Sequence, residues 1–126
     1  MKYLGIDFGL RRVGLAISEG ELASPYKIIE GRGVKDLAQK VGKVFMDEGF
    51  DVAVVGMPEG KMGQNVKGFN KILQKSGVLI IESDETLSSQ DALKEMIKQG
   101  VKREKRKLRD AFAASIILQN YLDEKS

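Results

Sequence analysis

Short apolar runs near the start of the chain predict three strands. Residues 2–8 and 13–18 are apolar segments joined by a turn around Gly9–Arg12, so we expect them to form a hairpin. A third strand is predicted from Ala23 to Ile29. Pro25 near its beginning favours a strand start or a position at the sheet edge, because proline cannot donate to a neighbouring strand.

The middle of the chain alternates between helical and strand-like patterns. Apolar residues recur at helical spacing across residues 34–49, which predicts a helix that glycine ends. Residues 51–56 and 78–81 are continuous apolar runs, typical of parallel strands that are buried on both faces. Between them, the glycine-rich segment 56–65 precedes a short helix that is expected to end at Gly77.

Two helices complete the predicted pattern, one from about Ser88 and the last from about Lys107 to Leu122. The predicted inward face of the last helix consists of Leu108, Ala111, Phe112, Ser115, Ile116, Gln119 and Leu122. The order of elements is β-β-β-α-β-α-β-α-α. This order predicts an α/β domain with a mixed sheet, helices on both faces, and the two later strands parallel to the first.

Composition narrows the chemistry that this chain can perform. Its 126 residues suggest one domain, residues 1–126, and a hydrophobic content of 42% is sufficient for a core. Neither cysteine nor histidine occurs. Disulfides, thiolate nucleophiles, histidine general bases and ordinary zinc sites are therefore excluded. Any acid–base or metal chemistry must use Asp, Glu, Lys, Tyr or hydroxyl groups.

Charge and hydropathy indicate the setting in which the protein works. The net charge of +3 permits a polyanionic partner without requiring one. No apolar run approaches the roughly 18–20 residues that a membrane helix needs. The first residues lack the long apolar region of a signal peptide. We therefore expect a cytoplasmic protein that makes no contact with a membrane.

Asp7 is an acid in the middle of the first predicted strand, within the stretch YLGIDFGLRRVGLA. Side chains alternate along a strand, so Asp7 shares a face with Tyr3 and Gly5. A buried carboxylate costs several kcal/mol unless it is paired, hydrogen-bonded or bound to metal. Two interpretations remain open, a structural ion pair with Arg11 or Arg12 across the hairpin and a functional carboxylate.

A second group of acids, Glu82, Asp84 and Glu85, follows the strand predicted at residues 78–81. Sites in parallel sheets form beyond the carboxyl ends of the strands, so these acids are candidates. The alternative is a solvated loop that leads into the next helix, whose N-cap would be Ser88 or Ser89. For Glu82 and Asp84 the loop interpretation is favoured.

Asp110 closes a third candidate segment, the basic stretch KREKRKLRD at residues 102–110. An acid in the first turn of a helix is stabilised by the helix dipole, so Asp110 also has a structural explanation. A run of basic residues is often a solvated loop. Here the run leads directly into a carboxylate, so phosphates held by the run would lie beside Asp110.

Dispersed carboxylates without histidine suit a hard divalent cation such as Mg²⁺ or Mn²⁺, which prefers oxygen ligands. Two such ions would activate water and stabilise the leaving oxygen in phosphodiester cleavage. Lysine and arginine would offset the charge of a nucleic-acid backbone. The combination predicts a nuclease.

The glycine-rich segment 56–65, GMPEGKMGQN, is a further candidate. Its three glycines allow close approach of a phosphate or an unusual turn. The segment does not match the Walker A pattern, which excludes a P-loop ATPase. A plain connection between a strand and a helix remains the alternative.

Four motifs in order resemble the YqgF family of bacterial RNase H-like proteins across nearly the whole chain. GIDFGLRRVGLAIS is similar to the opening D-x-G-x-x-R-x-G segment of the family, followed by A-S-P at residues 23–25. VVGMPEGKMG resembles its V-G-x-P…G loop, and SDETLSSQDA resembles its W-D-E-R-x-T-T-x-x-A segment. KRKLRDAFAASIILQNYLD resembles its closing segment.

The resemblance implies an RNase H-like fold with a mixed five-stranded sheet. It implies that the catalytic and metal-binding acids are Asp7, Glu85 and Asp110, and it selects Glu85 over the two neighbouring acids. The residues that it implies as substrate contacts are Arg11, Arg12, Lys105, Arg106, Lys107, Gly56, Pro58 and Gly63. The family has arginine after its D-E pair, where this chain has Thr86.

Three functions follow as hypotheses. The first is a metal-dependent nuclease that matures the 5′ end of the 16S rRNA precursor, with the ribosomal small-subunit precursor as its partner. The second is a Holliday junction resolvase that cuts branched DNA. The third is a non-catalytic, nucleic-acid-binding ribosome-assembly factor, which Thr86 favours. We expect a monomer or a weak homodimer. An actin-like kinase is disfavoured, because it needs two such lobes and 126 residues supply one.

Overall fold

The computed structural model describes residues 1–84 and 109–125 of the chain. Its strands are β1 (Tyr3–Phe8), β2 (Arg12–Ser18), β3 (Ser24–Glu30), β4 (Val52–Met57) and β5 (Ile80–Asp84). Its helices are α1 (Gly33–Asp47), α2 (Met62–Lys75) and α4 (Arg109–Lys125). Along the described residues, this order matches the sequence prediction. The helix predicted from about Ser88 lies outside the described residues.

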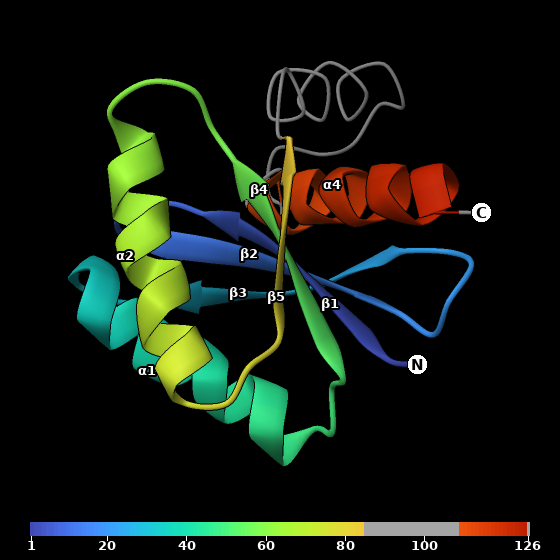
Figure 1. The fold of residues 1–126 in the computed structure, drawn as a ribbon, viewed down its shortest axis with the longest axis horizontal. Helices are drawn as coiled ribbons and strands as arrows, with labels where there is room; N and C mark the ends of the chain where they lie inside the picture. Colours follow the sequence, from blue (N-terminus) through green and yellow to red (C-terminus); the bar gives the residue numbers. More distant parts are fainter. Residues whose placement is uncertain (85–108, 126) are drawn as a thin grey trace.

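The strands form one mixed sheet in the order β3-β2-β1-β4-β5 (Figure 1). Strands β1, β2 and β3 are antiparallel neighbours, so the predicted hairpin is confirmed. Strand β4 runs parallel to β1, and β5 runs parallel to β4, also as predicted. Because β1 is central, its residues Tyr3–Ile6 pair with β2 on one side and with β4 on the other, whereas Asp7 and Phe8 pair with β2 alone.

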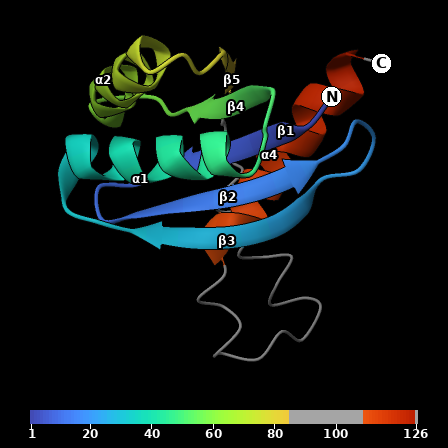
Figure 2. The same cartoon turned by 90° about the horizontal axis from the view of Figure 1, so that it is seen from below.

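Helices cover both faces of the sheet, as expected (Figure 2). Leu4, Ile6 and Phe8 of β1 pack in the core that α1 and α2 cover. Tyr3 points to the opposite face and packs in a second core with Ile117 and Leu118 of α4. The period-two alternation of β1 therefore assigns its even positions to one core and its odd positions to the other.

Helix α4 approaches the sheet closely, because two strand glycines leave room for its backbone. A Cβ atom on Gly5 would lie 2.8 Å from the Ala114 carbonyl oxygen, and one on Gly14 would lie 1.9 Å from the Asp110 carbonyl oxygen. No side chain larger than hydrogen fits at either strand position.

The face that α4 buries differs from the predicted one. Its buried residues are Ala111, Ala113, Ala114, Ser115, Ile117, Leu118 and Leu122. The predicted positions Phe112, Ile116 and Gln119 are partly exposed. Of the predicted residues, Ala111, Ser115 and Leu122 are confirmed as buried, and Leu108 lies outside the described residues. The close approach over two glycines places Ala113 and Ala114 on the inner face as well.

Two element boundaries also differ from the prediction. Strand β5 continues through Asp84, because Glu82, Ser83 and Asp84 pair with the last residues of β4. Helix α2 begins at Met62, so much of the predicted glycine-rich loop is strand or helix. The connection between β4 and α2 is reduced to residues 58–61.

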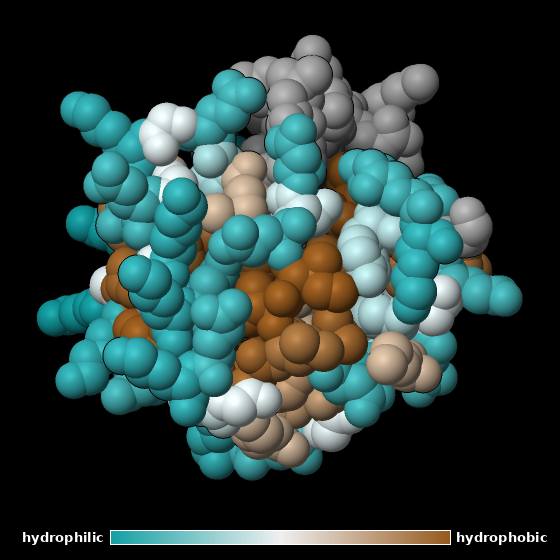
Figure 3. Space-filling model, in the orientation of Figure 1, coloured by the Kyte–Doolittle hydropathy of each residue, from teal (hydrophilic) through white to brown (hydrophobic). Residues whose placement is uncertain are grey.

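The face seen in Figure 3 carries apolar side chains near β5, between α2 and α4. Leu79, just before this edge strand, is 59% exposed, and Ile80 and Ile81 are only partly buried, so the prediction of burial on both faces is wrong for residues 79–81. Of the helices that the structure describes, none combines the length and apolar character needed to cross a membrane.

Candidate active site

Asp7 lies near the end of the central strand β1 and is 7% exposed. It points to the α4 face, because it follows the same alternation that directs Tyr3 into the second core. Its antiparallel partner on β2 is Gly14. Asp7 is therefore held by pairing with β2, one residue beyond the segment of β1 that also pairs with β4.

Asp110 lies in the first turn of α4 and is directly above that same glycine. The near-contact between the Asp110 backbone and Gly14 brings the first turn of α4 over the β1–β2 ladder. Two acids that are 103 positions apart in the sequence (110 − 7) thus come to one place. The sequence predicts both as candidate ligands, and the structure brings these two together.

A pocket of about 320 Å³ receives both acids. Its wall consists of Asp7, Phe8, Gly9, Leu10, Arg11, Arg12, Pro58, Met62 and Asp110. Three parts of the fold meet here: the β1–β2 hairpin, the start of α2 with the connection before it, and the start of α4. The pocket therefore combines carboxylates with two guanidinium groups.

Arg12 pairs with Asp110 across this pocket, with 3.7 Å between Arg12 Nε and Asp110 Oδ2. The Arg12 side chain is 48% exposed and that of Asp110 is 22% exposed. An ion pair with this much solvent access contributes little to stability. The guanidinium can therefore exchange the carboxylate for a phosphate oxygen at small cost.

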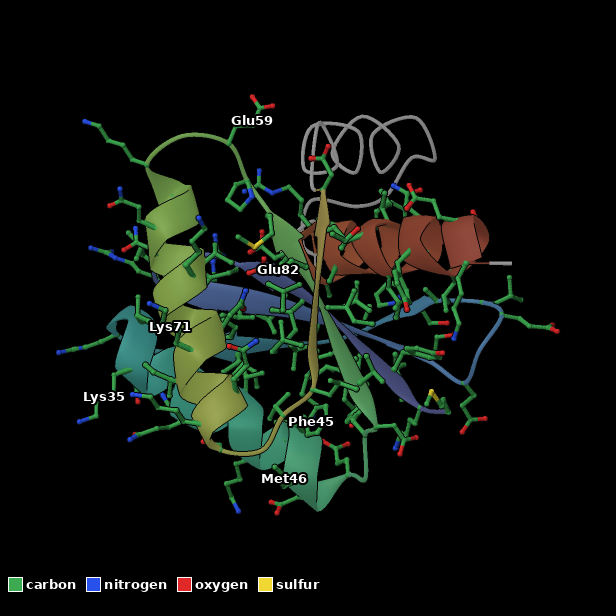
Figure 4. The ribbon with its side chains drawn as sticks, in the orientation of Figure 1. Lys35, Phe45, Met46, Glu59, Lys71 and Glu82 are labelled. Carbon is green, nitrogen blue, oxygen red and sulfur yellow. The ribbon has the colours of Figure 1, made fainter. Side chains whose placement is uncertain are left out.

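Of the other acids in the second predicted group, Glu82 and Asp84 are described by the structure and do not line this pocket. Glu85 lies outside the described residues, as do Lys105, Arg106, Lys107 and Thr86. Glu82 is on strand β5 and not in a loop, and its Oε2 accepts a 3.0 Å hydrogen bond from Asn70 Nδ2 on α2. Figure 4 shows Glu82 in the region between α2 and the sheet. The loop interpretation of Glu82 and Asp84 is wrong, because parallel pairing with β4 continues through both residues.

The predicted substrate contacts of the glycine-rich segment occupy different environments. Pro58 lines the pocket. Gly56 is inside β4, where it pairs with Ser83 of β5. Gly63 is in the first turn of α2, and a Cβ atom there would lie 3.2 Å from the Pro58 carbonyl oxygen. Glu59, in the same connection, points away from the domain (Figure 4).

The donor chemistry at the pocket fits a hard divalent cation in part. Two carboxylates line it, and oxygen ligands are what Mg²⁺ and Mn²⁺ prefer. Among residues 1–84 and 109–125, no group of three or more acidic side chains is placed to hold a metal ion. The third predicted ligand, Glu85, is outside those ranges.

Four residues of the pocket wall were not among the predicted site residues: Phe8, Gly9, Leu10 and Met62. Leu10 is 44% exposed at the tip of the β1–β2 turn. An apolar residue in a two-arginine turn is the signal that could have identified it. No comparable signal marks Met62, because the sequence pattern begins the helix several residues later.

The chain is similar to a known protein family and to named bacterial proteins over nearly its whole length. The family model RuvX, described as Holliday junction resolvase, matches residues 1–124. A Fusobacterium nucleatum protein named "Putative pre-16S rRNA nuclease" is 36% identical over 137 residues, which cover 98% of this chain and 98% of that protein. A protein of the same name from Endomicrobium trichonymphae is 33% identical over 136 residues, covering 99% and 97%.

Solved structures share the fold at low sequence identity. The fowlpox virus Holliday junction resolvase superposes with a TM-score of 0.65 at 12% identity, covering 100% of both chains. Thermus thermophilus RuvC in complex with a Holliday junction substrate superposes with a TM-score of 0.61 at 16% identity, covering 99% of this chain and 95% of that one. The predicted RNase H-like fold is confirmed.

Proposed function

The chain belongs to the RuvX family, also called YqgF, and from this premise we propose that it is a metal-dependent endonuclease that matures the 5′ end of the 16S rRNA precursor. Its family membership makes it a hydrolase that acts on ester bonds. We propose further that residues 1–126 act as one nuclease domain in the cytoplasm, with the ribosomal small-subunit precursor as partner.

One observation carries this proposal: Asp7 and Asp110, from opposite ends of the chain, line one pocket together with Arg11 and Arg12. A structural role alone explains each acid separately. It does not explain why both face a hollow that also contains two cations. Phosphodiester cleavage requires carboxylates that bind a metal cation, next to guanidinium groups that bind the phosphate.

Within this proposal, Asp7, Glu85 and Asp110 are the residues that would hold a divalent ion, Mg²⁺ or Mn²⁺. Such an ion would supply an activated water and would stabilise charge on the leaving oxygen. Arg12 and Arg11 orient the phosphate at the pocket, with Lys105, Arg106 and Lys107 as further phosphate contacts. Pro58 lines the wall that the substrate passes, and Gly63 packs against the Pro58 carbonyl, whereas Gly56 is buried in β4 and supports the wall from within the sheet.

The direct test is cleavage of a synthetic fragment of precursor 16S rRNA by the purified protein. Cleavage is expected with Mg²⁺ or Mn²⁺ and is expected to stop with EDTA. Asp7→Asn keeps the size and shape of the side chain and removes its charge, so it is expected to abolish cleavage while the protein stays folded. Undiminished cleavage by Asp7→Asn, or binding without cleavage under all these conditions, contradicts the proposal. The second result favours a non-catalytic assembly factor.

A second candidate, cleavage of branched DNA, is favoured by the description of the matching family as Holliday junction resolvase. Symmetric cutting of a four-way junction requires two sites, which a homodimer would supply. A four-way DNA junction and the rRNA fragment should be offered in parallel, with the mass in solution measured by gel filtration. Junction cleavage by a dimer, without rRNA cleavage, would favour this candidate over the first.

A further inference from the structure

A second hollow adjoins the candidate active site on the far side of the β1–β2 turn. This groove has a volume of about 1290 Å³. Its lining residues are Leu10, Arg11, Arg12, Glu30, Gly31, Arg32, Gly33, Asp36 and Lys40. Leu10, Arg11 and Arg12 also line the active-site pocket, so the two hollows share a wall. A chain-like ligand could occupy both at once.

Four cationic side chains and two acidic ones line the groove, so its cations outnumber its acids. Asp36 accepts a 2.8 Å hydrogen bond from the Arg32 backbone N–H and pairs with Lys40 at 3.3 Å. Lys40 Nζ also donates to the Glu30 carbonyl oxygen at 2.8 Å. Within the described part of the chain, the guanidinium groups of Arg11 and Arg32 take part in no salt bridge. These two groups are available to an anion.

The groove is built on a fixed backbone. The Gly31 N–H donates to the Arg11 carbonyl oxygen at 3.0 Å, and the Gly33 N–H donates to the Leu10 carbonyl oxygen at 3.2 Å. These bonds join Gly31 and the first residue of α1 to the β1–β2 turn. Arg32 is therefore displayed between two anchored glycines, at a set position relative to Arg11.

We propose that this groove binds the sugar–phosphate backbone of the nucleic-acid strand that leads into the active-site pocket. The inference rests on the proposed function, since it extends the same substrate beyond the scissile phosphate. Guanidinium groups make charge-assisted hydrogen bonds to phosphate oxygens, and consecutive phosphates of one strand can meet Arg12, Arg11 and Arg32 in turn. Leu10 stands between the two hollows and offers apolar contact to a base.

The test compares Arg32→Ala with Lys35→Ala as a matched control. Both substitutions remove one positive charge near the start of α1, but only Arg32 lines the groove. Lys35 is exposed and points away from the domain (Figure 4). Binding of a fluorescein-labelled oligouridine of roughly 20 nucleotides is measured by anisotropy in EDTA, across a series of salt concentrations.

Arg32→Ala is expected to raise Kd about three- to tenfold and to lower the slope of log K against log salt by about 0.7, the value for one single-strand phosphate contact. Lys35→Ala is expected to change Kd less than about twofold. A labelled dinucleotide is long enough to occupy only the active-site pocket and not the groove. Its Kd should therefore be the same for Arg32→Ala and for the wild type. Equal effects of the two substitutions overturn the proposal, as does an equal loss with the dinucleotide.

The binding assay separates this inference from the proposed function. EDTA removes the divalent ion, so the measurement does not depend on catalysis. If no condition supports cleavage but Arg32→Ala weakens oligouridine binding selectively, the groove proposal stands and the nuclease proposal fails. If the wild type cleaves the rRNA fragment and Arg32→Ala binds oligouridine as tightly as wild type, the nuclease proposal stands and the groove proposal fails.

Discussion

Gly14 of β2 lies so close to Asp110 of α4 that a Cβ atom on the glycine would be 1.9 Å from the Asp110 carbonyl oxygen. Gly14 is also the strand partner of Asp7. A single glycine therefore determines how near the first turn of α4 comes to the acid on β1. The separation of the two candidate ligands depends on a residue that carries no functional group.

Gly14→Ala is expected to displace the start of α4 and to impair the site. The obstructing atoms are backbone, so they cannot be relieved by a side-chain rotation. Overpacking of this kind costs about 1–3 kcal/mol of folding free energy. A displacement of about 1 Å at a catalytic group costs on the order of 100-fold in rate. Urea unfolding and single-turnover cleavage measure the two effects.

Gly68→Ala is the matched control for that substitution. Gly68 lies inside α2, and a Cβ atom there would come no closer than 3.9 Å to Val34. Alanine inside a helix is more favourable than glycine by roughly 0.5–1 kcal/mol. The control is expected to be slightly more stable than wild type and equally active. Normal cleavage by Gly14→Ala would contradict the role assigned to the close packing.

Arg12→Ala is expected to separate activity from stability. Its ion pair with Asp110 is 3.7 Å long and half exposed, so its loss should change the unfolding free energy by less than about 1 kcal/mol. Loss of a charge-assisted contact to phosphate should lower kcat/KM by about 10- to 100-fold. Arg12→Lys restores the charge without the planar fork and is expected to recover part of the activity. A large loss of stability without a loss of activity would indicate a purely structural arginine.

Glu82 is expected to be structural, in contrast to Asp7. The Asn70 side chain is buried, and its Nδ2 donates to Glu82 while its Oδ1 has no hydrogen-bond partner among the described residues. Glu82→Gln keeps an acceptor and adds a donor that can serve Oδ1, so stability and cleavage should stay close to wild type. Glu82→Ala leaves the buried amide without this acceptor and should cost about 1–2 kcal/mol. Abolished cleavage by a folded Glu82→Gln protein would contradict this assignment.

Stability at acidic pH should reveal the contacts of Asp36 at the start of α1. The Arg32 backbone N–H and, next, the Lys40 ammonium stabilise its carboxylate, which lowers the pKa of Asp36. A lowered pKa in the folded state means that the contribution is present above the unfolded pKa and is lost as pH falls through the folded value. Asp36→Asn should therefore be less stable than wild type at neutral pH, and the difference should shrink below about pH 4. A difference that is constant from neutral to strongly acidic pH would contradict the stabilised carboxylate.

Much of this fold follows from patterns that act over a few residues. The alternation in β1 predicted that Asp7 shares a face with Tyr3, and both do point toward α4. The continuous apolar run of β4 indicated burial on both faces, and the helices on both faces of the sheet provide it, with Val55 in one core and Val54 in the other. The spacing of apolar residues within one strand is therefore sufficient to predict which face each side chain occupies.

Other features could not be predicted, because they depend on contacts between distant segments. The inner face of α4 depends on contact with Gly5 and Gly14, which lie more than 90 positions earlier in the chain. The spacing of apolar residues within the helix gives no information about that contact. The extension of β5 through Asp84 depends on the length of β4. The sequence could identify Asp7 and Asp110 as candidates, but their meeting in one pocket depends on the packing of α4.

Crystals soaked in Mn²⁺ test the central claim most directly, because anomalous scattering locates the ion without reference to activity. The account predicts an anomalous peak in the pocket, with an oxygen of Asp7 and an oxygen of Asp110 each within about 2.0–2.4 Å of it. The peak should disappear in Asp7→Asn crystals grown in the same form. A Mn²⁺ peak that contacts neither carboxylate, or an empty pocket in the wild type at saturating Mn²⁺, would contradict the claim that these two acids form a metal-dependent active site.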